Sequence, residues 1–377
     1  MSELKIMVVY GTRPEAIKQI PVVKAIEAKG FRPIVCNTGQ HMEMVDQVVD
    51  LFHTKYDYNL GVMNDKKSLT HMTALLLTRI EEVIQKEKPD WIVVQGDTAS
   101  ALAGAMAGFF NQIKVAHVEA GLRTYNRWSP FPEEINRIYI SKITDLHFPP
   151  TKRAANNIAQ EFSTSKSDRA YITGNTVVDA LHWIHNNRLD AVDPELRRLV
   201  EDNPDDRVIL MTSHRRESFG EGIRNNCEAA LDLVSRFPDT RIIFPVHLNP
   251  RVKKPIEEML GQHDRIHLVP PVDYATMIFL IKNAYLILSD SGGIQEEAPS
   301  FGTPLLVLRD TTERPEAIEA GCAKLVGSVR EDIVREATRL LEDQTAYQQM
   351  ASVANPFGDG TAATQIVEHI VAAQQTA

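Results

Sequence analysis

The chain has 377 residues, of which 43% are hydrophobic and 24% are charged, and its formal net charge at pH 7 is -9. This composition excludes an intrinsically disordered chain, and the negative charge argues against a nucleic-acid-binding protein, which would show a basic stripe. The length is roughly twice that of a typical domain, so we expect two domains, each with its own core.

The cysteines and the apolar segments predict neither disulfides nor a membrane span. Cys36, Cys227 and Cys322 are far apart and form no Cys-x-x-Cys pair. The first apolar run is short and is followed at once by Arg13, which fits a strand better than a signal peptide. The Ala- and Gly-rich segment 99–110 is too short to cross a bilayer and fits a helix packed tightly on a sheet. We therefore expect buried thiols, no membrane contact and a cytoplasmic protein.

Short runs rich in β-branched residues alternate with longer helical patterns along the whole chain. The expected strands are residues 5–10, 33–37, 91–94, 114–118, 207–211, 241–246, 285–288 and 304–308. Such alternation is typical of parallel sheets with helices on both faces. The sequence therefore predicts an α/β protein.

The boundary between the domains is expected in the stretch 173–206, where Gly174 and Asn175 interrupt the pattern and a Pro- and Asp-rich segment follows. We expect an N-terminal Rossmann-like domain over residues 1–173 and a second one over residues 174–359. A final helix, at about 360–377, is expected to pack back on the first domain. The carboxyl ends of both sets of strands would face a cleft between the domains, where α/β sheets bind ligands.

The stretch LILSDSGGIQEEAPSFG joins a strand to a helix through Ser291, Gly292 and Gly293. Backbone N–H groups at such a helix start favour a phosphate, so this turn predicts a diphosphate-binding site. A Walker loop is excluded because no Gly-Lys-Ser/Thr follows. Either Glu296 or Glu297 could accept hydrogen bonds from a ribose. The alternative is an ordinary tight turn followed by two solvated acids.

The stretch ILMTSHRRESFGEG places His214, Arg215 and Arg216 directly after another expected strand. One histidine and two arginines beside a phosphate-binding turn would form an anion clamp, because Arg can bind two oxygens at once. Taken alone, the same residues could equally form an exposed basic loop.

Three carboxylates lie at strand ends or helix starts in the first half of the chain: Asp97, Glu119 and Glu133. Neighbouring carboxylates that face one cleft shift each other's pKa values, which suits acid and base catalysis. The alternatives are a helix N-cap for Asp97 and an intrahelical pair between Glu133 and Arg137.

Gln40, His41 and Glu43 follow the second expected strand. His41 has no metal-type partners nearby, and the chain contains no His-x-x-x-His pattern, so we expect a hydrogen-bonding role and no catalytic metal.

These motifs occur together in a fixed order: GTRPEAIK, GQHMEM, QGDTAS, HVEAGLRT with SPFPEE, TGNTVVDAL, HRRESFGEG, PVHLNP, SDSGGIQEEAPSFGTP and RDTTERPEA. Over nearly the whole chain they resemble the non-hydrolysing UDP-N-acetylglucosamine (UDP-GlcNAc) 2-epimerases. The opening turn, with Pro14 and the residues that follow it, favours this branch over the related hydrolysing enzymes.

The resemblance implies a glycosyltransferase-B-like arrangement of two Rossmann-like domains, with the active site in the cleft between them. UDP would be held mainly by the second domain, and the sugar would face the first. It also implies that the enzyme uses neither metal nor NAD nor any other cofactor, and that it is a homodimer. The implied reaction converts UDP-GlcNAc reversibly to UDP-N-acetylmannosamine (UDP-ManNAc). UDP is eliminated to leave a 2-acetamidoglucal, and it adds back after protonation of C2 from the opposite face. The product would supply ManNAc units for a cell-surface polysaccharide.

The resemblance also implies roles for individual residues. The acid/base set would be Asp97, Glu119 and Glu133, with His214 beside the leaving diphosphate. Asp97 and Glu133 are the leading candidates for proton transfer at C2. The residues implied to bind UDP are Arg13, Lys18, Arg215, Ser291, Gly292, Gly293, Glu297 and Arg314.

The family also has a second, activating UDP-GlcNAc site. Gln40, His41, Glu43, Arg215 and His247 could line it. Met42 and Leu75 stand where many bacterial members carry Arg, so activation by substrate stays open.

Two other functions are compatible with the same fold. A glycosyltransferase would present a similar UDP site but would need an acceptor. A UDP-sugar sensor would need only the UDP contacts, whereas this chain also carries the set of acid/base candidates.

Overall fold

The computed structural model describes residues 4–62, 68–162 and 169–375. The chain divides into two compact units, here called unit 1 and unit 2. Unit 1 contains the residues up to His182 and those from Phe357 onward, and unit 2 runs from Trp183 to Pro356. Among the described residues, no helix is both long enough and apolar enough to cross a membrane.

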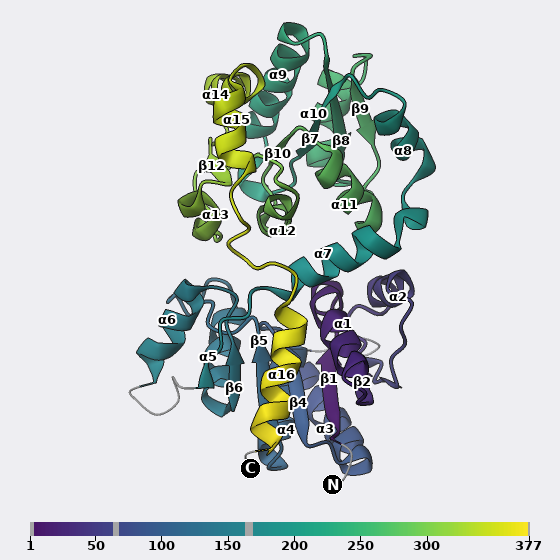
Figure 1. Cartoon of the computed structure of the whole chain (residues 1–377), viewed down its shortest axis with the longest axis vertical. Coiled ribbons are helices and arrows are strands. Elements are labelled where there is room, and N and C mark those ends of the chain that lie inside the picture. The colour runs from purple at the N-terminus through teal and green to yellow at the C-terminus, as the bar shows by residue number, and fades with distance from the viewer. Residues whose placement is uncertain (1–3, 63–67, 163–168, 376–377) are drawn as a thin grey trace. The chain divides into compact units, whose positions relative to one another are not determined.

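Unit 1 is built on a six-stranded parallel sheet with the order β3-β2-β1-β4-β5-β6 (Figure 1). Its strands are β1 (Ile6–Tyr10), β2 (Pro33–Asn37), β3 (Tyr58–Asn59), β4 (Trp91–Gln95), β5 (Lys114–Val118) and β6 (Leu146–Phe148). Its helices are α1 (Arg13–Ala28), α2 (Met42–Leu51), α3 (Leu69–Glu87), α4 (Ala99–Phe110), α5 (Glu133–Ile143), α6 (Lys152–Glu161) and α16 (Ala362–Gln375). Helix α1 contacts α2 and α16, whereas α4 contacts α3 and α5, so helices cover both faces of the sheet.

Unit 2 repeats this plan with the order β12-β11-β10-β7-β8-β9. Its strands are β7 (Arg207–Thr212), β8 (Thr240–Pro245), β9 (Ile266–Val269), β10 (Leu286–Ser289), β11 (Leu305–Val307) and β12 (Ala323–Leu325). The α-helices that follow α7 (Thr176–Asn187) are α8 (Pro194–Glu201), α9 (Glu221–Arg236), α10 (Pro250–Leu260), α11 (Tyr274–Asn283), α12 (Gly292–Glu297), α13 (Pro315–Ala320), α14 (Arg330–Glu342) and α15 (Gln344–Ala351). Short 3-10 turns lie at η3 (Leu189–Ala191), η4 (Arg216–Ser218) and η5 (Ala298–Phe301).

These two sheets confirm the predicted α/β class. Each sheet has the strand order of a Rossmann fold, in which the chain reverses direction across the sheet at one point. That switch point lies between β1 and β4 in unit 1 and between β7 and β10 in unit 2. Ligands of open α/β sheets bind at the carboxyl ends of the strands at this point.

The eight predicted strands are all present, within about a residue or two at each end. The four strands that the sequence did not predict are β3, β6, β9 and β12, and each lies at an edge of its sheet. These edge strands are only two to four residues long, so they lack the continuous apolar run of a central parallel strand.

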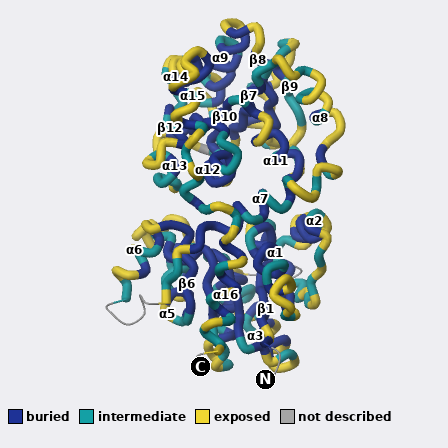
Figure 2. Tube along the Cα trace, viewed as in Figure 1, coloured by how far each residue is buried: buried dark blue, intermediate teal, exposed yellow. Residues whose placement is uncertain are grey.

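The central strands and the inner helices carry most of the buried residues, and the outward faces of α8, α14 and α15 are exposed (Figure 2). Helix α4 lies very close to the sheet, as its Ala- and Gly-rich sequence predicts. A Cβ on Gly104 would lie 2.9 Å from Cγ1 of Val94, and one on Gly108 would lie 3.1 Å from side chains of two strands. The three cysteines are free and buried, as expected.

Two sets of contacts join the C-terminal segment of unit 1 to the rest of the unit. The N–H of Asn175 donates to the carbonyl of Phe357 at 2.6 Å, and a Cβ on Gly174 would lie 2.9 Å from Cα of Gly358. Helix α16 packs on α1 and is tied to it by the Lys29–Glu368 ion pair. Because residues 174 and 175 are held by the segment that starts at Phe357, unit 1 extends past the boundary expected at Thr173, to His182.

Candidate active site

The predicted catalytic and UDP-binding residues lie in the segments that follow β1, β4 and β5 in unit 1 and β7, β10 and β11 in unit 2. The residues expected at a second ligand site follow β2 and β8. We describe the two clusters separately.

The turn after β1 is organised by Glu15. Its Oε2 accepts from the N–H groups of Gly11 and Thr12 at 3.1 and 2.8 Å, and Thr12 caps α1 in return, which is a capping box. Its Oε1 accepts from the hydroxyl of Thr98 at 2.6 Å, so the turn after β1 is tied to the turn after β4. Burial raises the pKa of Glu15, while the hydrogen bonds from Thr98 and Thr12 oppose that rise. A Cβ on Gly11 would lie 2.0 Å from Oγ1 of Thr38, so only glycine fits there.

Glu119 lies buried at the end of β5 and accepts hydrogen bonds from three side chains. Nζ of Lys18 lies 2.7 and 2.8 Å from its two oxygens, Gln95 donates to Oε2, and Asn175 donates to Oε1 at 3.2 Å. The backbone of Glu119 is left-handed, with φ of 58°, a conformation that costs an ordinary residue about 1–3 kcal/mol. The ammonium of Lys18 is thus paired within unit 1, and Arg13 lies partly buried at the first position of α1.

Asp97 lies just beyond β4 and is paired with Arg137, whose Nη2 is 2.5 Å from Oδ2. Burial raises the pKa of Asp97; the positive charge of Arg137 opposes this rise, and the negative charges of Glu119 and Glu133 add to it. The N-cap of α4 is Thr98 and not Asp97, so the capping alternative is wrong.

Glu133 begins α5, and its Oε2 is buried without a hydrogen-bond partner among the described residues. The proposed intrahelical pair of Glu133 with Arg137 is not formed, because Arg137 pairs with Asp97 and with Glu134 at 3.1 Å. Glu134 also accepts from the N–H groups of Thr124 and Tyr125, which fixes the loop before α5. A buried carboxylate oxygen without a donor is costly unless a ligand or a proton satisfies it.

In unit 2, the turns after β7 and β10 meet at Asp290. This carboxylate is fully buried, and its Oδ2 accepts from the N–H groups of His214 and Arg215 at 2.7 and 2.8 Å. Nδ1 of His214 lies 3.0 Å from Oδ1. Burial works to raise the pKa of Asp290, but the contacts with His214 and Arg215 hold it below its usual value.

The glycine-bearing turn has the geometry of an anion site. Ser291 is the N-cap of α12 but its side chain forms no cap hydrogen bond, and a Cβ on Gly293 would meet no atom closer than 3.9 Å. Nη2 of Arg215 lies 3.5 Å from the Cβ position of Gly292, and Nε of Arg215 is buried without a hydrogen-bond partner within the described ranges. Open backbone N–H groups beside such a guanidinium favour a phosphate. The side chain of Arg216 lies outside the described part of the structure.

Glu296 and Glu297 are both buried, so the alternative of two solvated acids is wrong. Arg314 forms an ion pair with Glu296. The hydroxyl of Tyr274 donates to Oε1 of Glu297 at 2.8 Å. The guanidinium of Arg314 is therefore engaged inside unit 2.

A buried arginine that the sequence analysis did not single out supports the loop after β7. Nε of Arg309 lies 2.6 Å from Glu217, and its Nη1 lies 2.7 Å from Glu313. The hydrogen bond from Arg309 lowers the pKa of Glu313 to about 2, although partial burial opposes this. The motif RDTTERPEA contains both Arg309 and Glu313. The other partner of Arg309, Glu217, is distant in sequence, so the motif alone could not reveal that ion pair.

The residues expected at a second ligand site lie in both units. His41 is the N-cap of α2, Glu43 lies exposed in its first turn, and Gln40 accepts from Ser100 at 3.1 Å. The ring of His247 stacks on that of His214 with centroids 6.1 Å apart.

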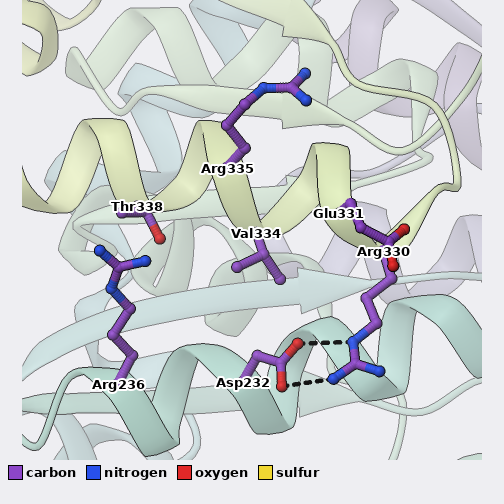
Figure 3. A pocket seen from close by; sticks show the side chains of 7 residues that line it. All are labelled: Asp232, Arg236, Arg330, Glu331, Val334, Arg335 and Thr338. Carbon is purple, nitrogen blue, oxygen red and sulfur yellow. Dashed lines mark hydrogen bonds and ion pairs between the residues drawn. The ribbon is translucent and has the colours of Figure 1, made fainter.

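A separate groove on unit 2 lies between α9 and α14 (Figure 3). Its lining residues are Asp232, Arg236, Arg330, Glu331, Val334, Arg335 and Thr338. Arg330 is paired with Asp232 at 2.7 Å, and none of the lining residues belongs to the switch-point turns.

Comparisons with known proteins identify the family of the chain. A family model described as UDP-N-acetylglucosamine 2-epimerase matches residues 24–371. A UDP-N-acetylglucosamine 2-epimerase of Yersinia pestis is 45% identical over 371 residues, which are 97% of this chain and 98% of the relative.

Solved structures show the same likeness. A UDP-GlcNAc 2-epimerase from Neisseria meningitidis, bound to UDP-GlcNAc, superposes with a TM-score of 0.83 at 43% identity and covers 98% of this chain and 100% of its own. A Methanocaldococcus jannaschii UDP-GlcNAc 2-epimerase in complex with UDP-GlcNAc and UDP has a TM-score of 0.74 at 35% identity, covering 98% and 99%. The chain therefore belongs to the UDP-N-acetylglucosamine 2-epimerase family.

Proposed function

We propose that this protein is a non-hydrolysing UDP-GlcNAc 2-epimerase, which converts UDP-GlcNAc reversibly to UDP-ManNAc. Its family membership and the relatives solved with UDP-GlcNAc support the substrate. The opening turn GTRPEAIK supports the non-hydrolysing branch. One observation carries the chemistry: unit 1 holds Asp97, whose pKa is raised, together with Glu133, whose buried oxygen has no donor among the described residues.

The proposed reaction is an elimination followed by a re-addition. A base removes the proton from C2 while the bond between C1 and the diphosphate oxygen breaks. The electrons of the C–H bond form the C1=C2 double bond of 2-acetamidoglucal, and UDP leaves with the electrons of the C–O bond. UDP then adds back to C1, and C2 takes a proton on its other face. The sequence consumes no oxidant and no water.

We assign the two proton transfers at C2 to Asp97 and Glu133, one on each face. A base works best when its pKa is close to the working pH, and burial moves Asp97 in that direction. The ion pair with Arg137 orients the carboxylate. Glu119 supports this step through its negative charge, which helps to raise the pKa of Asp97. Lys18 holds Glu119 in place.

We assign the binding of the diphosphate to Arg215 and to the turn of Ser291, Gly292 and Gly293, with His214 beside the leaving oxygen. Donors placed where negative charge develops usually make the largest contribution to catalysis. The buried Nε of Arg215, which has no hydrogen-bond partner among the residues that the structure describes, and the open space at Gly293 support this assignment.

We also propose roles for Arg13, Glu297 and Arg314. Arg13 is proposed to face the diphosphate, and Glu297, oriented by Tyr274, is proposed to bind the ribose. The ion pair of Arg314 with Glu296 supports a role in shaping this part of unit 2.

We also propose that Gln40, His41, Glu43 and His247 form a second UDP-GlcNAc site. A sigmoidal dependence of rate on UDP-GlcNAc, lost in His247→Asn, is expected if the site activates the enzyme. Hyperbolic kinetics in the wild type would contradict this part of the proposal.

The products of a reaction with UDP-GlcNAc test the central proposal. Separation of nucleotide sugars should show UDP-ManNAc, without free ManNAc and without any acceptor. Asp97→Asn and Glu133→Gln should each lower kcat by about 10²- to 10⁴-fold, the usual contribution of a general acid or base. Asp239→Asn, in an ion pair with Arg207 and with a side chain that is 49% exposed, is the matched control and should keep the wild-type rate.

Other products would point to other functions. Free ManNAc and UDP would indicate the hydrolysing branch. Transfer of the sugar to an added acceptor would indicate a glycosyltransferase, and binding without turnover would indicate a sensor. We further propose that the enzyme is a homodimer and that its product supplies ManNAc units for a cell-surface polysaccharide. Light scattering at working concentration tests the first statement.

A further inference from the structure

Asp290 is the most deeply buried charged group at the switch point of unit 2. It follows β10 directly, and its side chain is 0% exposed. A carboxylate in this setting must have its oxygens satisfied, because an unpaired buried charge is very costly. Its two oxygens have different neighbours.

The oxygen Oδ2 is saturated by the backbone of the neighbouring turn. It accepts from the N–H groups of His214 and Arg215 at 2.7 and 2.8 Å, and the hydroxyl of Ser213 lies 3.4 Å away. These contacts join the turn after β7 to the turn after β10. They also require that the atom at this position be an acceptor.

The oxygen Oδ1 faces the imidazole of His214. Nδ1 lies 3.0 Å from it, and Oδ1 is buried without an aligned hydrogen bond from any residue that the structure describes. The contacts of Asp290 with His214 and Arg215 keep the carboxylate ionised, so Oδ1 needs a donor. The donor at this distance is Nδ1–H.

We propose that Asp290 is a positioning residue, which holds the imidazole of His214 with Nδ1–H toward its own carboxylate. Nε2 is then the ring nitrogen that faces the ligand, as an acceptor in the neutral ring and as a donor in the imidazolium. The carboxylate also fixes the backbone of His214 and Arg215 against the turn that begins at Ser291. The inference rests on the proposed function only for the identity of that ligand, the diphosphate of a nucleotide sugar.

The loop is fixed from a second side by Arg309. Glu217, three residues after His214, is paired with the buried guanidinium at 2.6 Å. Asp290 thus holds the backbone at residues 214 and 215, and Arg309 holds the side chain of Glu217. The side chain of His214 is 39% exposed, so packing alone does not fix the ring. Its orientation therefore depends on contacts such as the one between Nδ1 and Asp290.

Asp290→Asn gives a sharp test, because the shape is kept while one oxygen becomes an NH2 group. The two backbone N–H groups require an oxygen at the Oδ2 position, so the NH2 group must take the Oδ1 position. There it donates to Nδ1 of His214 and forces the proton to Nε2. The variant should therefore carry the opposite tautomer, the effect that an Asp→Asn change has in the Ser-His-Asp triad.

The measurement is a long-range proton–nitrogen NMR spectrum of the histidine rings in the protein without ligand. His214→Asn assigns the signals by their disappearance. We expect Nδ1 of His214 to carry a proton in the wild type and to lose it in Asp290→Asn. A wild-type ring with bare Nδ1 and protonated Nε2 would overturn the proposal, and this reading needs no folded Asp290→Asn. Because no substrate is present, the result is independent of the epimerase activity.

Kinetics provide a second readout that a merely structural role would not give. Asp290→Asn should lower kcat by at least about tenfold with a smaller change in KM. In a His214→Asn background the same substitution should change kcat by less than about twofold, because its effect passes through the imidazole. Full, independent losses in the double variant would overturn the proposal. Asp239→Asn is the matched control and should leave the ring spectrum and kcat unchanged.

Discussion

Replacing Lys18 with Met tests whether this lysine holds Glu119 or serves mainly as a free cation for the substrate. The change removes an ammonium that lies 2.7 and 2.8 Å from a carboxylate whose side chain is 5% exposed. Removing one partner of a buried pair usually costs about 3–5 kcal/mol, because a charge stays buried and unpaired. Gln95 and Asn175 still donate to Glu119, so we expect the lower end of this range.

The assay is urea denaturation of the wild type, Lys18→Met, Glu119→Gln and the double variant. The double variant should be less destabilised than the sum of the single changes, because the pair is removed as a unit. Lys29→Met is the matched control. Lys29 lies at the same 2.7 Å from Glu368, but these side chains are 41% and 54% exposed, so the cost should be below about 1 kcal/mol. A loss of less than about 1 kcal/mol for Lys18→Met, with additive effects in the double variant, would show that Lys18 does not hold Glu119.

Three further predictions follow from groups in or near unit 1. Arg137→Met should raise the pKa of Asp97 further, because the positive charge of Arg137 opposes the effect of burial. The limb of the pH–rate profile that needs ionised Asp97 should therefore move to higher pH. An unchanged profile would contradict this prediction. Burial raises the pKa of Asp179 to about 6, so the stability linked to this group is present below about pH 4 and is lost as the pH rises through 6. The difference in free energy of unfolding between the wild type and Asp179→Asn should therefore change by up to about 3 kcal/mol over this pH interval. Thermal denaturation at several pH values measures it, and a difference that stays constant with pH would contradict the prediction. Gly104→Ala should lower the free energy of unfolding by about 1–3 kcal/mol, because its Cβ would lie 2.9 Å from Val94. Gly222→Ala is the control: its Cβ would lie 3.5 Å from the nearest neighbour, so the change should be neutral or stabilising. Equal effects of the two substitutions would rule out close packing as the cause.

The central strands could be predicted from the sequence, and the edge strands could not. A central parallel strand such as β4 is buried on both faces and appears as a continuous apolar run. β3 and β12 are two and three residues long and partly exposed, so hydrogen bonding to a neighbour defines them more than composition does.

The sequence also identified chemical groups without their partners. Asp97 and Glu133 could be proposed because they end a strand and start a helix. The pairing of Lys18 with Glu119 joins residues 101 positions apart, and no local pattern indicates it. For the same reason Asp290, which contacts residues 75 and 76 positions away, was not recognised as the support of His214.

Burial was the other property that local patterns did not reveal. Glu296 and Glu297 follow each other in a polar stretch and look solvated, yet both are buried and engaged by Arg314 and Tyr274. Glu15 is buried as well, and it caps its own helix.

The most direct test of the account is the fate of the C2 hydrogen. The purified protein should be incubated with UDP-GlcNAc in D2O and followed by proton NMR. We expect UDP-ManNAc with deuterium at C2, because in the proposed mechanism Asp97 and Glu133 exchange protons with solvent between the two half-reactions. Formation of UDP-ManNAc that keeps its original C2 proton, or no conversion at all, would contradict the account.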